Sequence, residues 1–479
     1  MATNDTLRNG EFGIRNSEST PQSAIRNPQS VDALVIGGGI AGMQSALDLA
    51  DQGYHVALVE KEASIGGKMI ALSKVFPTLD CCSCITTPKM SAVAHHENID
   101  LLTYCEVQNV SQNGGGFKAQ VVKKPRYVDE DKCTGCRQCE YACPIDIPSE
   151  FDLGLGAHRA IRVPFSTAVP QKVVLDIENC ILCGKCEKAC PHGCIDFTQT
   201  PQEFEIEAQA IVLATGFDLT PTNAKEEYGS GSLPNVVSPL VVERLLAPTG
   251  PYGHVLRPSD GKEPDSIAYV QCAGSRDKTL GVEYCSRICC MYAIKQAMLL
   301  SGALPLADIT IYYMDIRTFG KGYEQFYQNA RAMGIEFVKG KVAKISEDEA
   351  GGKQSGHNPV VRVELIDDGS RVVERQHDLV VLSTGMVPAY NPQEMYGVPI
   401  AADDGFVRLS APNLSPSVTD RPGIFVTGTA AGPMDIVDSI VLAGAAAAET
   451  AAYLQDSKQQ ISGNGQMAEA AIEAELVHV

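Results

Sequence analysis

The strongest constraint on this chain is a cysteine pattern that occurs twice in close succession. Each copy reads Cys-x2-Cys-x2-Cys-x3-Cys-Pro, and the eight positions are Cys133, Cys136, Cys139 and Cys143, then Cys180, Cys183, Cys186 and Cys190. This spacing is typical of proteins that hold two 4Fe-4S clusters. A zinc ion explains a single CxxC pair, but two complete four-cysteine runs fit tetrahedral zinc sites poorly.

The fourth cysteine of each run is expected to bind the other run's cluster. Three thiolates of one tight loop reach three irons of one cube, whereas the fourth, which precedes proline, points toward the second cube. The expected ligand sets are Cys133, Cys136, Cys139 and Cys190 for one cluster, and Cys180, Cys183, Cys186 and Cys143 for the other.

The composition describes a large protein whose cysteines serve metal binding. The chain has 479 residues, 44% of them hydrophobic, which is enough for two or three domains with cores. Seventeen cysteines without an apolar N-terminal stretch indicate a reducing compartment, so we expect a cytoplasmic location. No run reaches about 18 apolar residues, and we expect no transmembrane segment. The formal charge of −19 argues against a nucleic-acid partner.

Ordered structure is expected to begin at Val31 with a dinucleotide-binding unit. Residues 31–61 read as strand, glycine turn, helix and strand. Gly37, Gly39 and Gly42 form a GxGxxG fingerprint, in which the glycines permit the turn, the approach of a pyrophosphate and close helix packing. Glu60 ends the second strand, where an acid accepts hydrogen bonds from ribose hydroxyls. A tight glycine turn without a ligand is the structural alternative.

Later segments resemble flavoproteins that bind two dinucleotides, and this resemblance implies that the nucleotide is FAD. It comprises a Gly-Gly extension after Glu60 and apolar strands that end in Thr-Gly. The chain departs from the pattern at Thr429, where an Asp usually meets the ribityl chain. Binding there is expected to depend on backbone amides of the following turn and helix start. The expected FAD contacts are Gly37, Gly39, Ile40, Ala41, Gly42, Glu60, Lys61, Gly66, Gly67, Lys68, Thr215, Gly216, Thr384, Gly385, Gly428 and Thr429.

A second glycine fingerprint, as needed for a pyridine nucleotide, is missing. After a strand expected at 265–270, Cys272 stands near the position of the first glycine. Three more cysteines follow, and those at i and i+4 on a helix share a face. We therefore predict a third 4Fe-4S cluster, and electrons would use the space that NAD(P)H would have used. Its ligands are Cys272, Cys285, Cys289 and Cys290. Alternatively, Cys289 and Cys290 are small buried hydrophobic residues.

Longer motifs resemble the A-subunit (HdrA) family of heterodisulfide reductase, including its bacterial relatives. They are residues 77–90 (PTLDCCSCITTPKM), 124–136 (KPRYVDEDKCTGC), 154–170 (GLGAHRAIRVPFSTAVP), 271–277 (QCAGSRD) and 284–293 (YCSRICCMYA). The resemblance extends from Val31 to Tyr453. It implies FAD in a thioredoxin-reductase-like α/β framework with an inserted α+β ferredoxin-like domain. The chain is expected to lack the family's extra N-terminal domain and any ferredoxin repeat after Val441.

The family resemblance also implies partners and an activity. The partners would be heterodisulfide reductase subunits B and C, an electron-donor subunit of hydrogenase-linked or flavin oxidoreductase type, ferredoxin, and a second copy of the chain in a homodimer. The activity would be electron transfer, with flavin-based bifurcation between ferredoxin and a disulfide. Alternatives are a relay to a quinone-linked membrane complex and a stand-alone NAD(P)H-dependent flavin oxidoreductase. The missing second fingerprint argues against the latter.

The expected domains are a disordered leader (1–30), a discontinuous FAD-binding domain (31–125, 201–260 and 375–455), the ferredoxin-like insert (126–200), a nucleotide-domain relic with the third cluster (261–374) and a polar tail (456–479). Within the relic we expect a strand at 308–313 and a helix near 322–333. No catalytic residue is predicted. The remaining cysteines have no assigned role: Cys81, Cys82 and Cys84 line the flavin, bind a further centre or are idle thiols, and Cys105 and Cys194 are structural.

Overall fold

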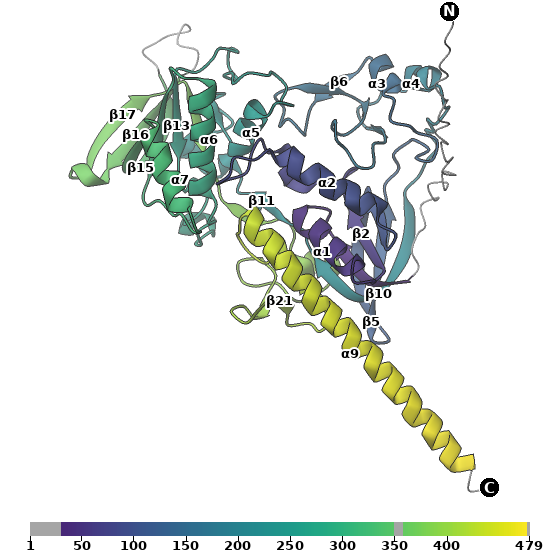
Figure 1. The fold of residues 1–479 in the computed structure, drawn as a ribbon. Helices are drawn as coiled ribbons and strands as arrows, with labels where there is room; N and C mark the ends of the chain where they lie inside the picture. The colour runs from purple at the N-terminus through teal and green to yellow at the C-terminus, as the bar shows by residue number, and fades with distance from the viewer. Residues whose placement is uncertain (1–29, 349–357, 477–479) are drawn as a thin grey trace, which may run out of the picture.

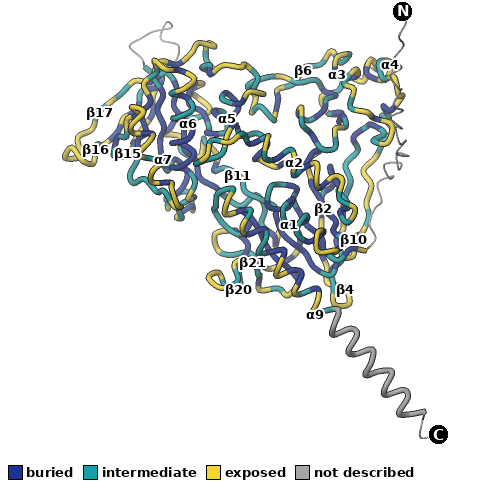
Figure 2. Tube along the Cα trace, in the orientation of Figure 1, coloured by how far each residue is buried: buried dark blue, intermediate teal, exposed yellow. Residues whose placement is uncertain are grey.

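The computed structural model describes residues 30–348 and 358–476, arranged as two α/β units and a smaller cysteine-rich unit (Figure 1). Each α/β unit is built on its own sheet, and buried residues follow the strands of both sheets (Figure 2). The expected leader lies outside the described residues except for Ser30, which begins the first strand.

The first sheet has a parallel centre with the order β22-β10-β1-β2-β3. Its nine strands are β1 (Ser30–Ile36), β2 (Val56–Glu60), β3 (Ile99–Thr103), β4 (Cys105–Asn113), β5 (Gly116–Lys123), β10 (Gln202–Leu213), β20 (Leu409–Ala411), β21 (Ser415–Thr419) and β22 (Ile424–Val426). The two faces of β1 alternate, as expected for a strand covered on both sides. Ala33 and Val35 pack with helices, whereas Leu34 and Ile36 pack with β4 and β5 residues.

Three helices cover one face of this sheet: α1 (Ile40–Ala50), α2 (Cys82–His95) and α9 (Ile436–Leu476). The first part of α9 lies against α1 and β21 through small side chains such as Ala443 and Ala447 (Figure 1). Residues 456–476, which we expected to be part of a polar tail, continue this helix.

The first part of α9 is also long and apolar enough to cross a membrane. This holds by length and composition alone over Ile436–Ser457, the one such helix in the part of the chain that the structure describes. The sequence, which has no run of about 18 consecutive apolar residues, led us to expect no transmembrane segment. Because alanine-rich core helices pass the same test, and this helix packs on α1, the feature is weak evidence for a membrane span.

The second sheet has the order β12-β18-β13-β14-β15-β16-β17. Its strands are β12 (Val236–Val237), β13 (Ser266–Val270), β14 (Asp308–Tyr313), β15 (Glu336–Glu347), β16 (Pro359–Leu365), β17 (Arg371–Gln376) and β18 (Leu379–Leu382). The helices of this unit are α5 (Pro239–Leu246), α6 (Cys289–Ala303) and α7 (Tyr323–Ala332). The predicted strand at 308–313 and the predicted helix near 322–333 are confirmed by β14 and α7.

Two strands differ from the expected domain boundaries. β12 and β18 lie in residues assigned to the FAD-binding domain, yet both belong to the second sheet, where β18 pairs in parallel with β13. The sequence could not assign either strand to its sheet, because a short apolar strand fits either buried parallel sheet. The chain passes twice between the two α/β units. The two connecting segments pair with each other as a short antiparallel ladder of β11 (Phe217–Leu219) and β19 (Met386–Pro388), and helix α8 (Pro392–Tyr396) follows β19.

The cysteine-rich unit is inserted between β5 and β10, which are antiparallel neighbours. It contains α3 (Gln138–Ala142), α4 (Lys185–Ala189), β6 (Asp146–Pro148), β7 (Ala157–Arg159), β8 (Ile161–Arg162) and β9 (Val174–Leu175). Its small core combines Val128, Ile161 and Leu175 with several cysteines. The buried Arg244 of α5 binds Asp152 of the insert at 3.0 Å, which fastens the insert to the second unit.

Candidate flavin and iron–sulfur sites

The glycine turn after β1 forms an open cradle at the start of α1. Gly37 has φ +112°, and a side chain there would overlap the carbonyl oxygen of Ala214. A side chain on Gly42 would overlap the carbonyl of Gly37, so the helix can approach the turn only with glycine. The space at Gly39, which precedes α1, is open. The amino end of α1 is therefore free to receive a phosphate group.

Glu60 lies at the carboxyl end of β2 and is held against this turn. Its carboxylate accepts hydrogen bonds from the backbone N–H of Gly38 at 2.6 Å and of Glu62 at 2.8 Å. Burial raises the pKa of Glu60, although both backbone hydrogen bonds oppose the increase. The carboxylate keeps unused lone pairs, which ribose hydroxyls can donate to.

The Gly-Gly extension lies directly on the turn. The N–H of Gly66 donates to the carbonyl of Gly38 at 2.9 Å, and a side chain on Gly67 would lie 2.9 Å from the Cα of Gly39. The lysines expected at the flavin are exposed and have other contacts. Lys68 forms an ion pair with Asp218 at 2.8 Å, and Lys61 lies over the ring of Tyr390.

The Thr-Gly segments separate into two places. A side chain on Gly428 would lie 2.6 Å from the Cβ of Ala41, and Gly216 lies near Thr429, so the structure brings these residues to the cradle. Thr384 and Gly385 contact the second unit instead. The carbonyl of Thr384 accepts a hydrogen bond from the hydroxyl of Tyr292 at 3.0 Å, as expected from the placement of β18 in the second sheet.

The two cysteine runs have the same backbone course. Arg137 and Gly184 occupy equivalent positions before α3 and α4, and both have left-handed φ values, 62° and 69°. This repeated turn lies between the second and third cysteines of each run. Each run then ends at the helix that carries its third cysteine.

The structure brings together the cysteines of each expected ligand set. Burial raises the pKa of Cys139 to about 12, and the neighbouring thiols of Cys133, Cys190 and Cys136 add to this increase. Burial also raises the pKa of Cys186, with contributions from Cys180 and Cys143. An apolar hollow lined by Ile145, Ile161, Leu175 and Phe197 holds all four thiols of the second set: Cys143, Cys180, Cys183 and Cys186. The fourth cysteine of each run therefore lies with the other run.

The described residues offer no site for a single metal ion. Across residues 30–348 and 358–476, no three His, Cys, Asp or Glu side chains converge closely enough to hold one ion. Cluster ligands need no such convergence, because each thiolate of a cubane set binds a different iron. The donors are sulfur and the surroundings are apolar, which fits iron–sulfur clusters.

The third cysteine group lies at the carboxyl end of β13. Cys272 follows this strand, and Cys289 and Cys290 begin α6. Burial raises the pKa of Cys290 to about 12, with contributions from Cys272 and Cys285. Burial likewise raises the pKa of Cys289, with contributions from the other three thiols. All four predicted ligands are thus neighbours, and a bound metal centre would have to displace their protons.

Sequence reasoning missed two residues beside these cysteines. Arg276 places Nη1 4.0 Å from Sγ of Cys272 and also binds Asp315 at 2.6 Å. Cys194, expected to be structural only, lies beside Cys190 of the first ligand set. Arg276 could have been noticed in the sequence, because it is a cationic residue four positions after the predicted ligand Cys272. Cys194 could not, because it belongs to neither four-cysteine run.

Cys81 and Cys84 are joined by a disulfide, whereas the fifteen other cysteines have free thiols. Cys82 between them is buried, as is Cys105. Burial raises the pKa of Cys82 to about 12. The CxxC pair therefore differs from every cysteine group described above.

Two family models match the two kinds of site. The first is a 4Fe-4S dicluster domain over residues 132–195, and the second is an FAD binding domain over residues 32–74. Among solved structures, thioredoxin reductases from Lactococcus lactis and T. acidophilum each align with a TM-score of 0.50 and 14% identity. They cover 89% and 90% of this chain, and each is itself covered to 99%. The chain is therefore an α/β flavoprotein with a thioredoxin-reductase-like fold and an iron–sulfur domain, which confirms the expected fold class.

Curated relatives narrow the class to a family. The iron-sulfur A-subunit of the CoB–CoM heterodisulfide reductase of Methanocaldococcus jannaschii is 46% identical over 90% of this chain and 65% of its own length. The A-subunit of the H2/formate:CoB-CoM heterodisulfide,ferredoxin reductase of Methanococcus maripaludis is 46% identical over 95% of this chain and 69% of its own length. The chain belongs to the A-subunit (HdrA) family of heterodisulfide reductase. It spans about two thirds of the length of these two relatives.

Proposed function

We propose that the chain is the FAD- and iron–sulfur-containing electron-transfer component of a heterodisulfide-reductase-type oxidoreductase. The observation that carries this proposal is the combination, in one polypeptide, of a glycine cradle and three groups of four cysteines. The third group stands at the end of β13, where a pyridine nucleotide would otherwise bind. Sulfur ligands at that position favour electron transfer through a cluster over hydride transfer.

FAD fits the first cradle on the chemistry of its residues. The open space at Gly39 and the amino end of α1 would receive the pyrophosphate, and Glu60 would accept hydrogen bonds from the ribose. The backbone near Gly428 and Thr429 would line the flavin end. When bound, FAD exchanges electrons singly or in pairs, whereas iron–sulfur clusters carry one electron at a time.

Three clusters fit the three cysteine groups. The predicted crosswise sets would hold two clusters in the insert, and Cys272, Cys285, Cys289 and Cys290 would hold the third. The third group lies in the second unit, where Sγ of Cys289 contacts the carbonyl of Thr384, and it would exchange electrons with the flavin of the first unit.

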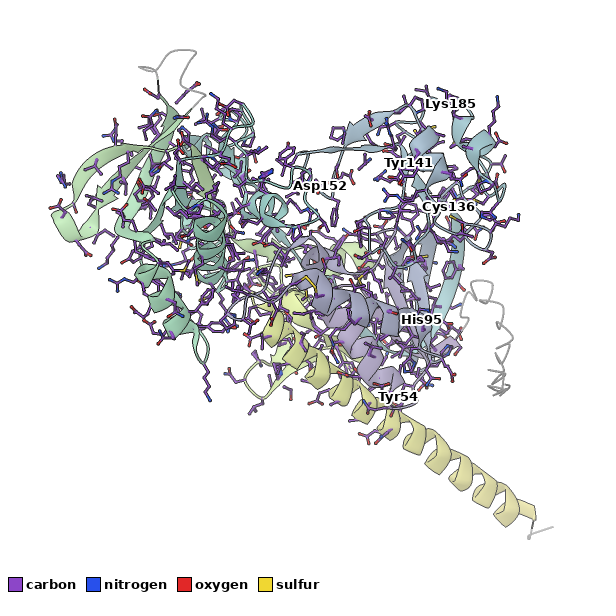
Figure 3. All side chains as sticks on the ribbon, turned by 45° about the horizontal axis from the view of Figure 1, so that its top comes forward. Tyr54, His95, Cys136, Tyr141, Asp152 and Lys185 are labelled. Carbon is purple, nitrogen blue, oxygen red and sulfur yellow. A yellow bond between two sulfur atoms is a disulfide. The ribbon has the colours of Figure 1, made fainter. Side chains whose placement is uncertain are left out.

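The insert offers a surface for an electron-transfer partner. Three apolar side chains stand exposed next to its cysteines: Tyr141 (74% exposed), Ile181 (61%) and Leu182 (64%). Cys136, Tyr141 and Lys185 all lie on the insert (Figure 3). Cys136 and Cys183 are themselves exposed, so a partner's redox centre could approach closely.

The proposed activity is flavin-based electron bifurcation between ferredoxin and a disulfide acceptor. The name of the Methanococcus maripaludis relative pairs a heterodisulfide with ferredoxin, which supports this proposal. A Methanosarcina mazei relative, 42% identical over 95% of this chain and covered over 55% of its own length, is named as the A-subunit of a ferredoxin:CoB-CoM heterodisulfide reductase. The proposed partners are heterodisulfide reductase subunits B and C, a second copy of the chain, ferredoxin and an electron-donor subunit, in the cytoplasm.

Anaerobic purification of the native assembly tests the proposal. We expect FAD, about twelve iron atoms per chain, and copurifying subunits with cysteine-rich motifs. The purified chain alone should not be reduced rapidly by NADH or NADPH. Rapid reduction by either nucleotide would contradict the proposal and favour a stand-alone flavin oxidoreductase.

A further inference from the structure

The disulfide between Cys81 and Cys84 begins α2. Cys81 precedes the first turn, and its Sγ accepts a hydrogen bond from the backbone N–H of Cys84 at 3.2 Å. Cys84 is exposed and Cys81 is partly exposed. A negative charge on Sγ of Cys81 would be stabilised there by this N–H and by the positive end of the helix.

The cysteine between the pair does not share its environment. Cys82 is fully buried on the side of Lys295 and Glu243, and its raised pKa keeps it a neutral thiol. Cys81 and Cys84 are thus a two-sulfur unit. The cluster cysteines, in contrast, gather in groups of four with free thiols.

The segment before the pair is anchored to the second unit. The ammonium of Lys295 in α6 donates to the carbonyl of Lys74 at 2.8 Å, and Glu243 in α5 accepts from the hydroxyl of Ser73 at 2.7 Å. The ring of Phe76 meets that of Tyr323 in α7. These contacts fix the start of α2 where the two α/β units meet (Figure 1).

The other side of α2 contacts the nucleotide cradle. The helix packs on α1 and on the 3-10 helix Gly67–Ala71, which follows the Gly-Gly extension. The pair therefore stands between the cradle and the helix that carries the third cysteine group, with Cys84 exposed to solvent.

We propose that Cys81 and Cys84 form a redox-active dithiol–disulfide couple that exchanges an electron pair with an external dithiol. A thiolate of the dithiol attacks Sγ of Cys84, the S–S bond breaks, and Cys81 leaves as a thiolate that its hydrogen bond stabilises. The second thiolate of the dithiol then breaks the mixed disulfide and releases Cys84. The external dithiol is oxidised to its disulfide, and its two electrons and two protons appear on Cys81 and Cys84.

This couple goes beyond the proposed function. Because it needs neither FAD nor a cluster, a negative result for the couple leaves the proposed function standing, and a negative result for the proposed function leaves the couple standing. The test equilibrates the intact chain anaerobically with mixtures of reduced and oxidised dithiothreitol, followed by alkylation under denaturing conditions and peptide mass spectrometry. Alkylation of Cys81 and Cys84 should rise together, from about a tenth to about nine tenths, over an approximately hundredfold change in the ratio. Cys82 in the same peptide is the internal control and should be alkylated at every ratio.

A variant completes the test. Cys84→Ser should leave Cys81 alkylated at every ratio, with unchanged iron and flavin contents, and Cys105→Ala should titrate like the native chain. Three results would overturn the proposal. They are alkylation of the pair at all ratios, alkylation only after a chelator has removed iron, and a pair that stays oxidised in excess reductant. The unmodified chain alone distinguishes these results, even if a variant does not fold.

Discussion

The Sγ atom of Cys194 lies 3.2 Å from the Sγ atom of Cys190. Cys190 belongs to the first proposed ligand set, and a ligand in the thiolate form can only accept a hydrogen bond. With Cys190 bound to a cluster as a thiolate, the S–H of the buried Cys194 would be the donor in this contact. Such a hydrogen bond stabilises the more negative, reduced state of a cluster and raises its reduction potential.

Replacement of Cys194 should therefore lower the potential of one insert cluster. Loss of one hydrogen bond is worth about 1 kcal/mol, which corresponds to a decrease of ~40 mV for one electron. A redox titration followed by electron paramagnetic resonance would measure the change in Cys194→Ala. Cys105→Ala, a buried cysteine in β4, is the matched control and should leave the potential unchanged. An unchanged potential in Cys194→Ala would show that the contact does not reach the cluster.

Arg276 should raise the potential of the third cluster. Its guanidinium lies beside Cys272, and a positive charge favours the reduced cluster. Arg276→Gln should lower that potential by at least about 20 mV, a twofold change in the one-electron equilibrium. Arg276→Lys keeps the charge and should retain most of the potential. The same titration measures both variants, and an increase in Arg276→Gln would contradict the assignment.

How much was predictable from the sequence depends on whether a feature is local. Ligand spacing and the glycine fingerprint describe single loops, so the crosswise cysteine sets and the turn at Gly37 could be written down in advance. The position of Thr384 depends on which sheet contains β18, and the apolar sequence of a buried strand does not indicate the sheet to which the strand belongs. Cys194 and Arg276 act through proximity across a loop, which no spacing rule describes. The Cys81–Cys84 bond likewise depends on the capped start of α2.

The second unit should lose stability in mild acid because of His377. Burial lowers the pKa of His377 to about 4, and Tyr312 and Ser266 hold the neutral ring through hydrogen bonds of 2.9 and 2.8 Å. In the unfolded chain the imidazole binds a proton below about pH 6.5. The unfolded state therefore binds more protons, and stability falls as the pH decreases from about 6.5 toward 4, by up to ~3 kcal/mol.

Denaturant unfolding at pH 7 and pH 5 tests this dependence. The native chain should show a lower free energy of unfolding at pH 5, and His377→Gln should show a smaller difference between the two pH values. The exposed His95 offers a control, since His95→Gln should leave the difference unchanged. Equal pH dependence in His377→Gln and the native chain would contradict the prediction.

We propose that a third cluster occupies the place of a nicotinamide in the second unit. The most direct measurement is the iron content of anaerobically purified Cys289→Ala compared with the native chain, each normalised to protein. We expect the variant to lose about four of about twelve iron atoms while the signals of the insert clusters remain. Equal iron in the two proteins, with a pyridine nucleotide bound beside Cys272, would contradict the account.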